Sequence, residues 1–418
     1  MLSQRDNETL TQTGPGTPMG NLFRRFWLPA LVPDELPSPD CPPIRFRILG
    51  EDLIAFRDTS GKVGFVANAC PHRGASLFFG RNEEDGLRCV YHGWKFDTTG
   101  ACVDMPSEPA ESNFRSKVRV TAYPAAERGG LVWIYMGPKE KQPELPHYEW
   151  CLKHYPNLKV YKWLQESNYT QGIEGDLDTV HINFLHGGLP PARRDEARPR
   201  MSSTPKLEIR ETDFGFVYGG RRETPDGKYY WRITAHVLPC FTQIPSRGWD
   251  GSGNWVVPQD DEHSWWFTVS PPGYRAAAGA PEREHVVLIP GSFRQTLNKA
   301  NDYGIDREMQ RSQNYTGLPG NRVQDSMVTE SMGAIYDRRN EHLGTTDQAI
   351  IFFRRQMIRL ARDLEKGIEP PILHDASLFR ARPVDIVTDE TELDSIWEND
   401  RAAHLAEPPA PLPAIPAR

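Results

Sequence analysis

Two short stretches of the sequence each place a cysteine close to a histidine. Cys70 and His72 lie in "CPHRG", and Cys89 and His92 lie in "CVYHGWKFD", with sixteen residues between the two pairs. Zinc binds thiolates and imidazoles together, and so does a two-iron cluster in which two cysteines hold one iron and two histidines hold the other. Because each pair mixes the two kinds of ligand, the pattern favours the two-iron cluster, with zinc or chance as the alternatives.

A second group of candidate ligands lies in "EGDLDTVHINFLHGG". Asp178 precedes His181 by three residues, and His186 follows five residues later. If residues 178–181 are helical, Asp178 and His181 lie on one face, and the glycines after His186 allow its ring to point back toward them. Two histidines and one carboxylate leave positions open on a non-haem Fe(II) for O2 and substrate. Polar residues on an ordinary helix face are the alternative.

The two cysteine–histidine pairs resemble the Rieske cluster-binding motif of the ring-hydroxylating oxygenase family. The resemblance implies a [2Fe-2S] cluster in which Cys70 and Cys89 hold one iron and His72 and His92 hold the other. The flanking residues that match the pattern are Arg73, Gly74, Gly93 and Trp94.

The stretch around Asp178 resembles the mononuclear-iron motif of the same family, and the two motifs occur in the expected order. The resemblance implies that His181 and His186 bind Fe(II). It also implies that Asp178 is not a ligand but a bridge between the iron site and a cluster histidine of a neighbouring subunit. Glu174 and Asp176 match no role in the motif, and we expect them on a solvated face.

The third iron ligand is expected to be a carboxylate farther along the chain. The candidates are Asp325, Glu330, Asp337, Glu341 and Asp347. The segment "SMGAIYDRRNEHLGTTDQAIIFFRR" resembles the phthalate 4,5-dioxygenase branch, in which the aspartate of "LGTTD" opens the final helix and binds iron. We therefore predict Asp347 as the third ligand. An aspartate in the first turn also stabilises a helix N-terminus, so both roles are open to Asp347.

The elements that would position these residues differ between the two parts of the chain. From about residue 45 to 137 the sequence shows short β-like runs separated by turn residues, among them "LIAFR", "VGFVA", "LRCVY" and "GLVWIYMG". The charged, proline-rich "PKEKQPELPHYEW" indicates a linker that ends near residue 150. Residues 1–150 are thus predicted to form an antiparallel Rieske β domain with an N-terminal extension.

Residues 151–400 are predicted to form the catalytic domain. In "FGFVYGGRRETPDGKYYWRITAHVL" two β-like runs flank a Pro-Asp-Gly turn, and "HSWWFTVS" is a further run. Apolar residues then recur at helical spacing before Gly367, which favours a helix end: Ile350, Phe353, Met357, Leu360 and Leu364. We expect an α+β fold whose second domain is an antiparallel sheet flanked by helices, followed by a proline-rich tail at 401–418.

Composition limits the class of protein. The chain has 418 residues, more than one core usually supports, and a net charge of -7 without a basic block, so we expect no nucleic-acid partner. The sequence contains no apolar run of about 18 residues that could span a membrane. The start "MLSQRDNETL" lacks the features of a signal peptide, so we expect a cytoplasmic location. Six cysteines are too sparse for a disulfide scaffold.

The reaction and its partners follow from the resemblance. Because no strand is followed by G-x-G-x-x-G, we expect electrons from a flavin/iron–sulfur reductase, or from a ferredoxin and its reductase. Relatives oxidise aromatic acids with O2, either by cis-dihydroxylation of the ring or by O-demethylation, and assemble as homotrimers or stacked trimers. Arg232 and His236, on the predicted hairpin, are candidate contacts for a substrate carboxylate. A Rieske electron carrier is the alternative, and it would need neither His181 nor His186.

Overall fold

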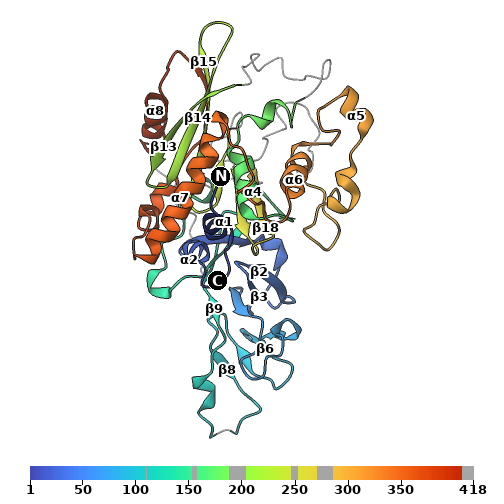
Figure 1. Cartoon of the computed structure of the whole chain (residues 1–418). Helices are drawn as coiled ribbons and strands as arrows, with labels where there is room; N and C mark the ends of the chain where they lie inside the picture. The colour runs from blue at the N-terminus through green and yellow to red at the C-terminus, as the bar shows by residue number, and fades with distance from the viewer. Residues whose placement is uncertain (110, 153–157, 188–203, 246–252, 271–285, 407–418) are drawn as a thin grey trace.

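The computed structural model describes residues 1–109, 111–152, 158–187, 204–245, 253–270 and 286–406. The chain is elongated, with small β-sheets at one end and a large sheet with helices against it at the other (Figure 1). Within the described residues, none of the helices has the length and apolar character needed to cross a membrane. The predicted α+β class is confirmed.

Three small antiparallel sheets form the N-terminal part. The first contains β1 (Trp27–Leu31), β11 (Leu131–Tyr135) and β10 (Ala125–Arg128). The second contains β2 (Ile44–Ile48), β3 (Glu51–Arg57), β4 (Val63–Ala67) and β9 (Ala122–Tyr123). The third contains β5 (Arg81–Glu83), β6 (Gly86–Arg88), β7 (Lys95–Phe96) and β8 (Cys102–Asp104). The predicted antiparallel β domain is therefore present.

One predicted β run is wrong in part. The run at 87–91 is strand only as far as Arg88, where β6 ends. Residues 89–92 then form a tight loop, because Gly93 has a φ of +77° and turns the chain back into β7. This loop contains two of the candidate cluster ligands, Cys89 and His92.

Among the described residues of the second part, one antiparallel sheet of eight strands dominates. Its order is β12–β18–β17–β16–β15–β14–β13, with β19 beside β15. The strands are β12 (Lys159–Gln165), β13 (Lys206–Thr212), β14 (Gly215–Glu223), β15 (Tyr229–Val237), β16 (Phe241–Gln243), β17 (Gly253–Pro258), β18 (Ser264–Ser270) and β19 (Val384–Thr388). The predicted hairpin is β14–β15, with Glu223 opposite Tyr229 across the turn.

The helices lie against this sheet and beside it (Figure 1). They are α1 (Gln4–Thr11), α2 (Pro18–Phe23), α3 (Glu149–Leu152), α4 (Tyr169–Leu177), α5 (Arg307–Ser312), α6 (Asn321–Ser331), α7 (Gln348–Glu365) and α8 (Leu393–Ala406). Helix α7 is the predicted amphipathic helix, with Phe353 and Met357 fully buried. Helices α1 and α2 pack on α7, so the start of the chain contacts the second part.

An aromatic cluster joins the small sheets to the large one. Trp133 of β11 stacks on Trp150, with ring centroids 6.2 Å apart, and meets Trp255 of β17 edge to face. Such buried rings contribute much of the apolar area in a core. At the other end of the chain, α8 extends into the segment predicted as a tail, and residues 407–418 lie outside the described residues.

Candidate metal centres

The two cysteine–histidine loops have the same backbone geometry. The Cys70 N–H donates to the Ala75 carbonyl (2.8 Å), and the Cys89 N–H donates to the Trp94 carbonyl (2.8 Å). In each loop a glycine four residues after the cysteine has a positive φ, +78° at Gly74 and +77° at Gly93. Side chains are rarely tolerated in that region, which explains why both loops need glycine. The two loops therefore present their ligands in matching ways.

The thiols and the imidazoles of these loops differ in exposure. Cys70 and Cys89 are each 3% exposed, whereas His72 and His92 are partly exposed. The two histidine rings lie edge to face with centroids 4.4 Å apart, and His72 stacks on Trp94 at 4.2 Å. Burial, and also the neighbouring thiol of Cys89, raise the pKa of Cys70 to about 11. Two buried thiols beneath two outer imidazoles fit a cluster with cysteines on one iron and histidines on the other.

The second centre begins where α4 ends. Residues 178–181 do not continue this helix, because α4 stops at Leu177 and Asp178 has a non-helical backbone. The Asp178 carboxylate accepts hydrogen bonds from the Val180 N–H (2.6 Å) and the His181 N–H (3.3 Å). This turn still brings Asp178 to His181, with Oδ2 3.7 Å from Nδ1. Burial alone would raise the pKa of Asp178, but its hydrogen bonds lower it below the usual value.

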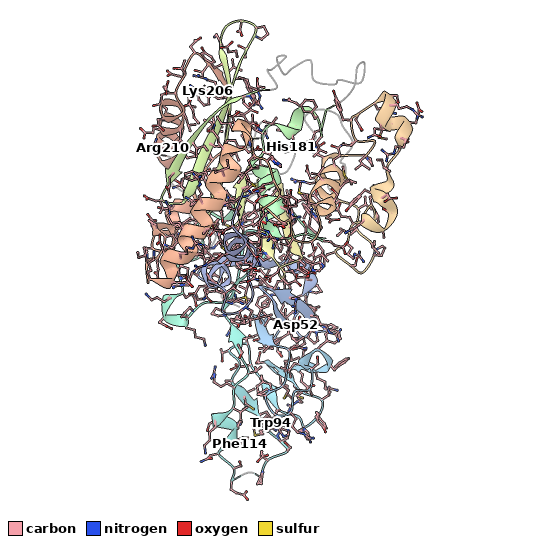
Figure 2. All side chains as sticks on the ribbon, in the orientation of Figure 1. Asp52, Trp94, Phe114, His181, Lys206 and Arg210 are labelled. Carbon is pink, nitrogen blue, oxygen red and sulfur yellow. The ribbon has the colours of Figure 1, made fainter. Side chains whose placement is uncertain are left out.

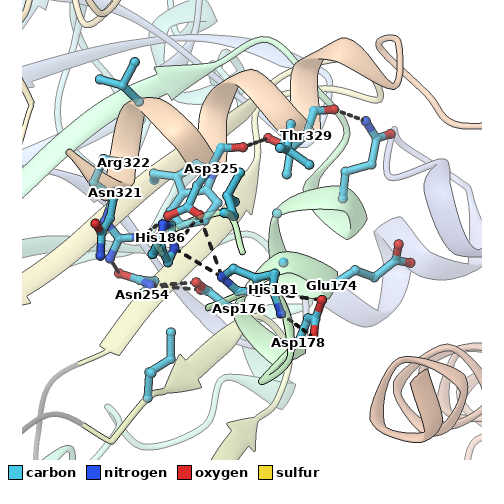
Figure 3. Close-up of a pocket in the computed structure, with 18 of the residues that line it drawn as sticks. Glu174, Asp176, Asp178, His181, His186, Asn254, Asn321, Arg322, Asp325 and Thr329 are labelled. Carbon is cyan, nitrogen blue, oxygen red and sulfur yellow. Dashed lines mark hydrogen bonds and ion pairs between the residues drawn. The ribbon is translucent and has the colours of Figure 1, made fainter. Parts of the chain in front are cut away.

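The two histidines converge with a carboxylate from α6 (Figure 3). His186 Nε2 lies 3.2 Å from His181 Nε2 and 3.1 Å from Asp325 Oδ1. His181 Nε2 lies 4.0 Å from the same oxygen. In the described part of the chain, these residues form the only group of three His, Cys, Asp or Glu donors within 4.8 Å of one another. Two imidazoles and one carboxylate on one side of a metal fit the facial triad of non-haem iron.

The choice of Asp347 as the third ligand is not supported by this geometry, which favours Asp325. Asp347 lies at the start of α7, where its Oδ2 accepts the Gly344 N–H at 2.6 Å, and it does not line the cavity beside the histidines. Its carboxylate therefore fixes the short turn at Thr345–Asp347 that leads into α7. The remaining candidates have other partners: Glu330 bonds Tyr303, Asp337 bonds Arg339, and Glu341 bonds Arg354.

A cavity of about 970 Å³ opens beside the three converging side chains. Its apolar lining includes Ile182, Leu185, Ile244, Trp266 and Val269. Arg232 also lines it, is 9% exposed and donates from Nη1 to the Pro245 carbonyl at 3.2 Å. The cavity thus combines an apolar wall with a buried cation.

The second candidate for a carboxylate contact, His236, does not face this cavity. It is fully buried between the rings of Phe216 and Phe353, and burial lowers its pKa to about 3. The ring is therefore neutral at physiological pH and offers no positive charge. The prediction for His236 is wrong because α7 covers this residue, whereas Arg232 on the same strand face borders the cavity.

The acids of α4 are likewise not on a solvated face. Asp176 is half-buried and lines the cavity, and Asn254 Nδ2 donates to both of its carboxylate oxygens at 2.9 Å. Burial raises the pKa of Asp176 to about 7. Glu174 also lines the cavity and contacts two buried arginines. The expectation that these two acids are solvated is therefore wrong.

Family models match both parts of the chain. Residues 26–124 match the Rieske [2Fe-2S] domain, and residues 134–382 match the LigXa C-terminal domain like family. The first match resolves the alternatives of zinc and chance for the cysteine–histidine loops. The second covers more than half of the chain, which a simple electron carrier would not require.

Known proteins resemble the whole chain. It is 37% identical to the oxygenase subunit of 3-chlorobenzoate-3,4-dioxygenase from Comamonas testosteroni, over 91% of this chain and 93% of that protein. It is 36% identical to the phthalate 4,5-dioxygenase oxygenase subunit from Pseudomonas putida, over 88% of each. It is 33% identical to the 5,5'-dehydrodivanillate O-demethylase oxygenase subunit from Sphingobium sp., over 92% of this chain and 86% of that protein.

Solved structures show the same fold. Dicamba monooxygenase bound to dicamba matches 83% of this chain and 100% of its own, with a TM-score of 0.58 at 18% identity. The oxygenase in an oxygenase–ferredoxin complex of carbazole 1,9a-dioxygenase matches 85% of this chain, with a TM-score of 0.54 at 17% identity. With both metal-binding motifs, both family matches and the similarity over most of its length, the chain belongs to the Rieske non-haem iron oxygenases, as a terminal oxygenase subunit of the phthalate 4,5-dioxygenase-like branch.

Proposed function

We propose that this oxygenase oxidises an aromatic acid, by ring cis-dihydroxylation or by O-demethylation of a methoxylated acid. The observation that carries the proposal is the convergence of His181, His186 and Asp325 at the wall of a large, partly apolar cavity. When bound, the iron would supply O2 activation and the cluster would supply electrons. The residues of the chain hold these groups, orient the substrate and exclude water.

Arg232 supports the acidic character of the substrate. Its guanidinium lies in the cavity wall, and among the described residues it donates to the neutral carbonyl of Pro245. A buried charge without a counter-charge is costly, and a carboxylate can pair with guanidinium through two hydrogen bonds. The apolar wall would meanwhile contact an aromatic ring. Three of the relatives named above also act on acids or on a methoxylated compound, according to their names.

Asp178 is proposed as the link between the two centres, with the electron passing between subunits of a homotrimer. Figure 2 shows Trp94, beside the cluster loops, at one end of the chain and His181 far from it in the other part. Within one subunit such a separation disfavours direct transfer. The Asp178 carboxylate, 3.7 Å from the His181 ring on one side, could accept a hydrogen bond from a cluster histidine of the neighbour on the other. The partly exposed rings of His72 and His92 are accessible for that contact.

The electron donor is proposed to be a flavin/iron–sulfur reductase, or a ferredoxin with its reductase. The exposed side chains beside His92 support docking at that end of the molecule, because Tyr91 is 54% exposed and Val90 is 59% exposed. Exposed apolar groups that adjoin a redox centre are suited to contact with a second protein.

The test is oxygen uptake by the iron-loaded protein with a surrogate reductase and a panel of aromatic acids. Product mass then separates the two reactions: a gain of two oxygens and two hydrogens indicates dihydroxylation, and loss of CH2 with formaldehyde released indicates O-demethylation. Arg232→Gln removes charge-assisted hydrogen bonds to the carboxylate, which contribute about 1.5–3 kcal/mol. We therefore expect the variant to lower kcat/KM for the acid about 10- to 100-fold. The same variant should leave turnover of the matching amide unchanged.

Arg210→Gln is the matched control. Arg210 lies on β13 of the same sheet, away from the cavity lining, and pairs with Asp394 and Glu398 of α8. Equal losses for the acid and the amide in Arg232→Gln would contradict the carboxylate contact. Absence of iron at His181 in the wild-type protein would contradict the oxygenase function itself.

A further inference from the structure

We infer that Gln324 is a positioning residue that fixes His186 in the orientation and tautomer needed to bind iron through Nε2. The inference rests on the iron site proposed above. His186 Nδ1 lies 2.7 Å from Gln324 Oε1, while His186 Nε2 faces the carboxylate of Asp325 at 3.1 Å. The two ring nitrogens therefore face two neighbouring residues of α6.

The orientation of the Gln324 amide is set by its second contact. Its Nε2 donates to the Leu318 carbonyl at 3.1 Å, and a carbonyl oxygen accepts only N–H or O–H donors. The amide oxygen must then be the atom that faces His186. The side chain is 4% exposed, so water has little access to replace its hydrogen bond with His186.

The tautomer of His186 follows from that orientation. An amide oxygen has no hydrogen to donate, so His186 Nδ1 must carry the proton. The lone pair of a neutral ring is then on Nε2, which points toward His181 and Asp325. Metal-bound histidines in proteins commonly donate their other ring N–H to an acceptor, which orients the ring and increases its basicity as a ligand.

The two histidines of the site differ in this respect. His181 Nδ1 faces the carboxylate of Asp178 at 3.7 Å, whereas His186 Nδ1 faces a neutral amide. The charged acceptor belongs to the residue proposed to link the two centres. The neutral acceptor belongs to α6, which also supplies the third ligand through the next residue. Helix α6 therefore contributes one ligand directly and orients a second one.

The inference is tested by Fe(II) affinity in three variants of the full-length protein with its cluster intact. Gln324→Met keeps the length of the side chain but removes the acceptor, and we expect Fe(II) binding to weaken about 10- to 100-fold. Gln324→Glu restores an acceptor at the same place and should bind within a fewfold of wild type or more tightly. Affinity is measured by competition with a chelator, with the cluster absorbance as the reference for protein concentration.

Gln356→Met is the matched control, because Gln356 is also a buried helical glutamine that donates to a backbone carbonyl, that of Gly215. It should bind Fe(II) as wild type does. Wild-type affinity in Gln324→Met, or equal weakening in Gln324→Met and Gln324→Glu, would overturn the inference. Failure of the iron site itself is recognised separately, because His186→Ala would then also leave Fe(II) binding unchanged.

Discussion

At the scale of single residues, the molecule uses carboxylates of the same kind for different tasks. Asp325 lines the cavity beside two imidazoles, whereas Asp347 accepts a hydrogen bond from the Gly344 N–H in the turn before α7. Both lie near the start of a helix, α6 for Asp325 and α7 for Asp347. The task of each is set by what the helix faces, since a carboxylate binds a metal only where other donors converge.

Replacing each of the two aspartates separately with alanine should therefore distinguish the iron ligand from the residue with a structural role. Asp325→Ala is expected to lose mononuclear iron and oxygen uptake while the cluster spectrum stays intact, because the two centres share no ligand. Asp347→Ala should keep both, and should lower the free energy of unfolding by about 1 kcal/mol through loss of the hydrogen bond from Gly344. Iron content, visible absorbance and urea denaturation give the three readouts. If Asp347→Ala lost iron and Asp325→Ala kept it, Asp347 would be the third ligand, as the sequence predicts.

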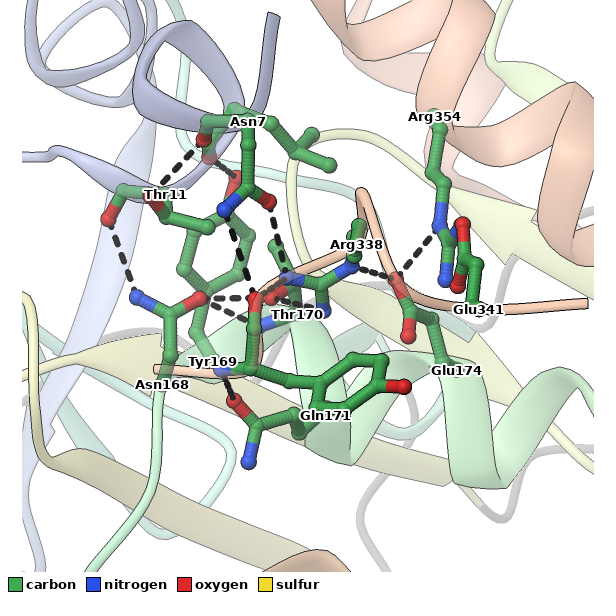
Figure 4. Close-up of polar contacts among 12 residues, drawn as sticks. Asn7, Thr11, Asn168, Tyr169, Thr170, Gln171, Glu174, Arg338, Glu341 and Arg354 are labelled. Carbon is green, nitrogen blue, oxygen red and sulfur yellow. Dashed lines mark hydrogen bonds and ion pairs between the residues drawn. The ribbon is translucent and has the colours of Figure 1, made fainter. Parts of the chain in front are cut away.

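At the scale of elements, α4 is the helix that connects the site to the rest of the fold. Its residue Glu174 bonds the Nε atoms of two buried arginines, Arg338 at 3.0 Å and Arg354 at 2.8 Å (Figure 4). Arg338 also donates to Thr170 of α4 and to Asn7 of α1. This network ties α4 to α1, to α7 and to the segment before α7. It holds the end of α4, from which Asp178 and His181 continue, in place.

Glu174→Gln should lower stability strongly, by about 3–5 kcal/mol, because two buried arginines lose their shared counter-charge. Burial raises the pKa of Glu174, but Arg338 and Arg354 outweigh it, so the folded pKa lies below the usual value. The stabilisation by Glu174 is then complete above the pKa of the unfolded chain and is lost as pH falls through the folded pKa. Unfolding by urea from neutral to acidic pH should show a flatter dependence in Glu174→Gln.

Glu211→Gln provides the comparison for this prediction. Glu211 pairs with Arg359, and its side chain is 43% exposed. An exposed pair contributes at most about 1 kcal/mol, so the variant should unfold close to wild type. Equal costs for the two substitutions would mean that the buried network adds no more than a surface ion pair.

The contact between the two parts of the chain contains a buried lysine. Lys162 of β12 pairs with Glu35 at 2.9 Å and donates to the Ala30 carbonyl at 3.0 Å. The rings of Trp265 and Phe293 lie 4.5 Å from its ammonium nitrogen. Burial lowers the pKa of Lys162 although Glu35 raises it.

Lys162→Met should destabilise the protein by about 3–5 kcal/mol, since it leaves Glu35 without its partner in a largely buried position. The double variant Lys162→Met/Glu35→Gln should recover a substantial part of that loss, because no unpaired charge remains. Denaturation of the wild type, the two single variants and the double variant at pH 7 measures the coupling. Additive effects of the two substitutions would show that the pair does not act as a unit.

At the scale of the whole molecule, the two metal centres lie in different parts of an elongated chain (Figure 2). In the proposed homotrimer, the cluster of one subunit serves the iron of the next. Variants that each lack one centre, Cys70→Ser and His181→Ala, should be inactive alone. Mixed trimers purified through two different tags should regain about a third of the activity, because a cyclic trimer of two subunit types has one productive interface.

The control for this complementation mixes His181→Ala with the double variant Cys70→Ser/His181→Ala, in which no subunit has an iron site. That mixture should stay inactive. A wild-type rate of cluster reduction in the active mixture confirms that the electron donor still docks. Inactive mixed trimers of the two single variants would place the transfer within one chain and would contradict the proposed role of Asp178.

The sequence alone determined the features that depend on neighbours along the chain. The ligand types and their spacing, the hairpin around Pro225, the amphipathic α7 and the glycines at positions 74 and 93 all reflect local geometry, which short patterns encode. The two metal-binding motifs lie in the two matched regions, the first within residues 26–124 and the second within residues 134–382. The division of the chain near residue 150 stays a prediction.

Only the tertiary structure decided which distant groups meet. Five candidate carboxylates followed the two histidines in the sequence, and Asp325 reaches the histidines because α6 packs across α4, more than a hundred residues earlier in the chain. His236 and Arg232 share a strand face, yet α7 covers the first and the cavity receives the second. Gln324 acquires its role in the same way. Contacts of this kind depend on how helices and sheet pack together, which the local pattern of apolar and polar residues does not specify.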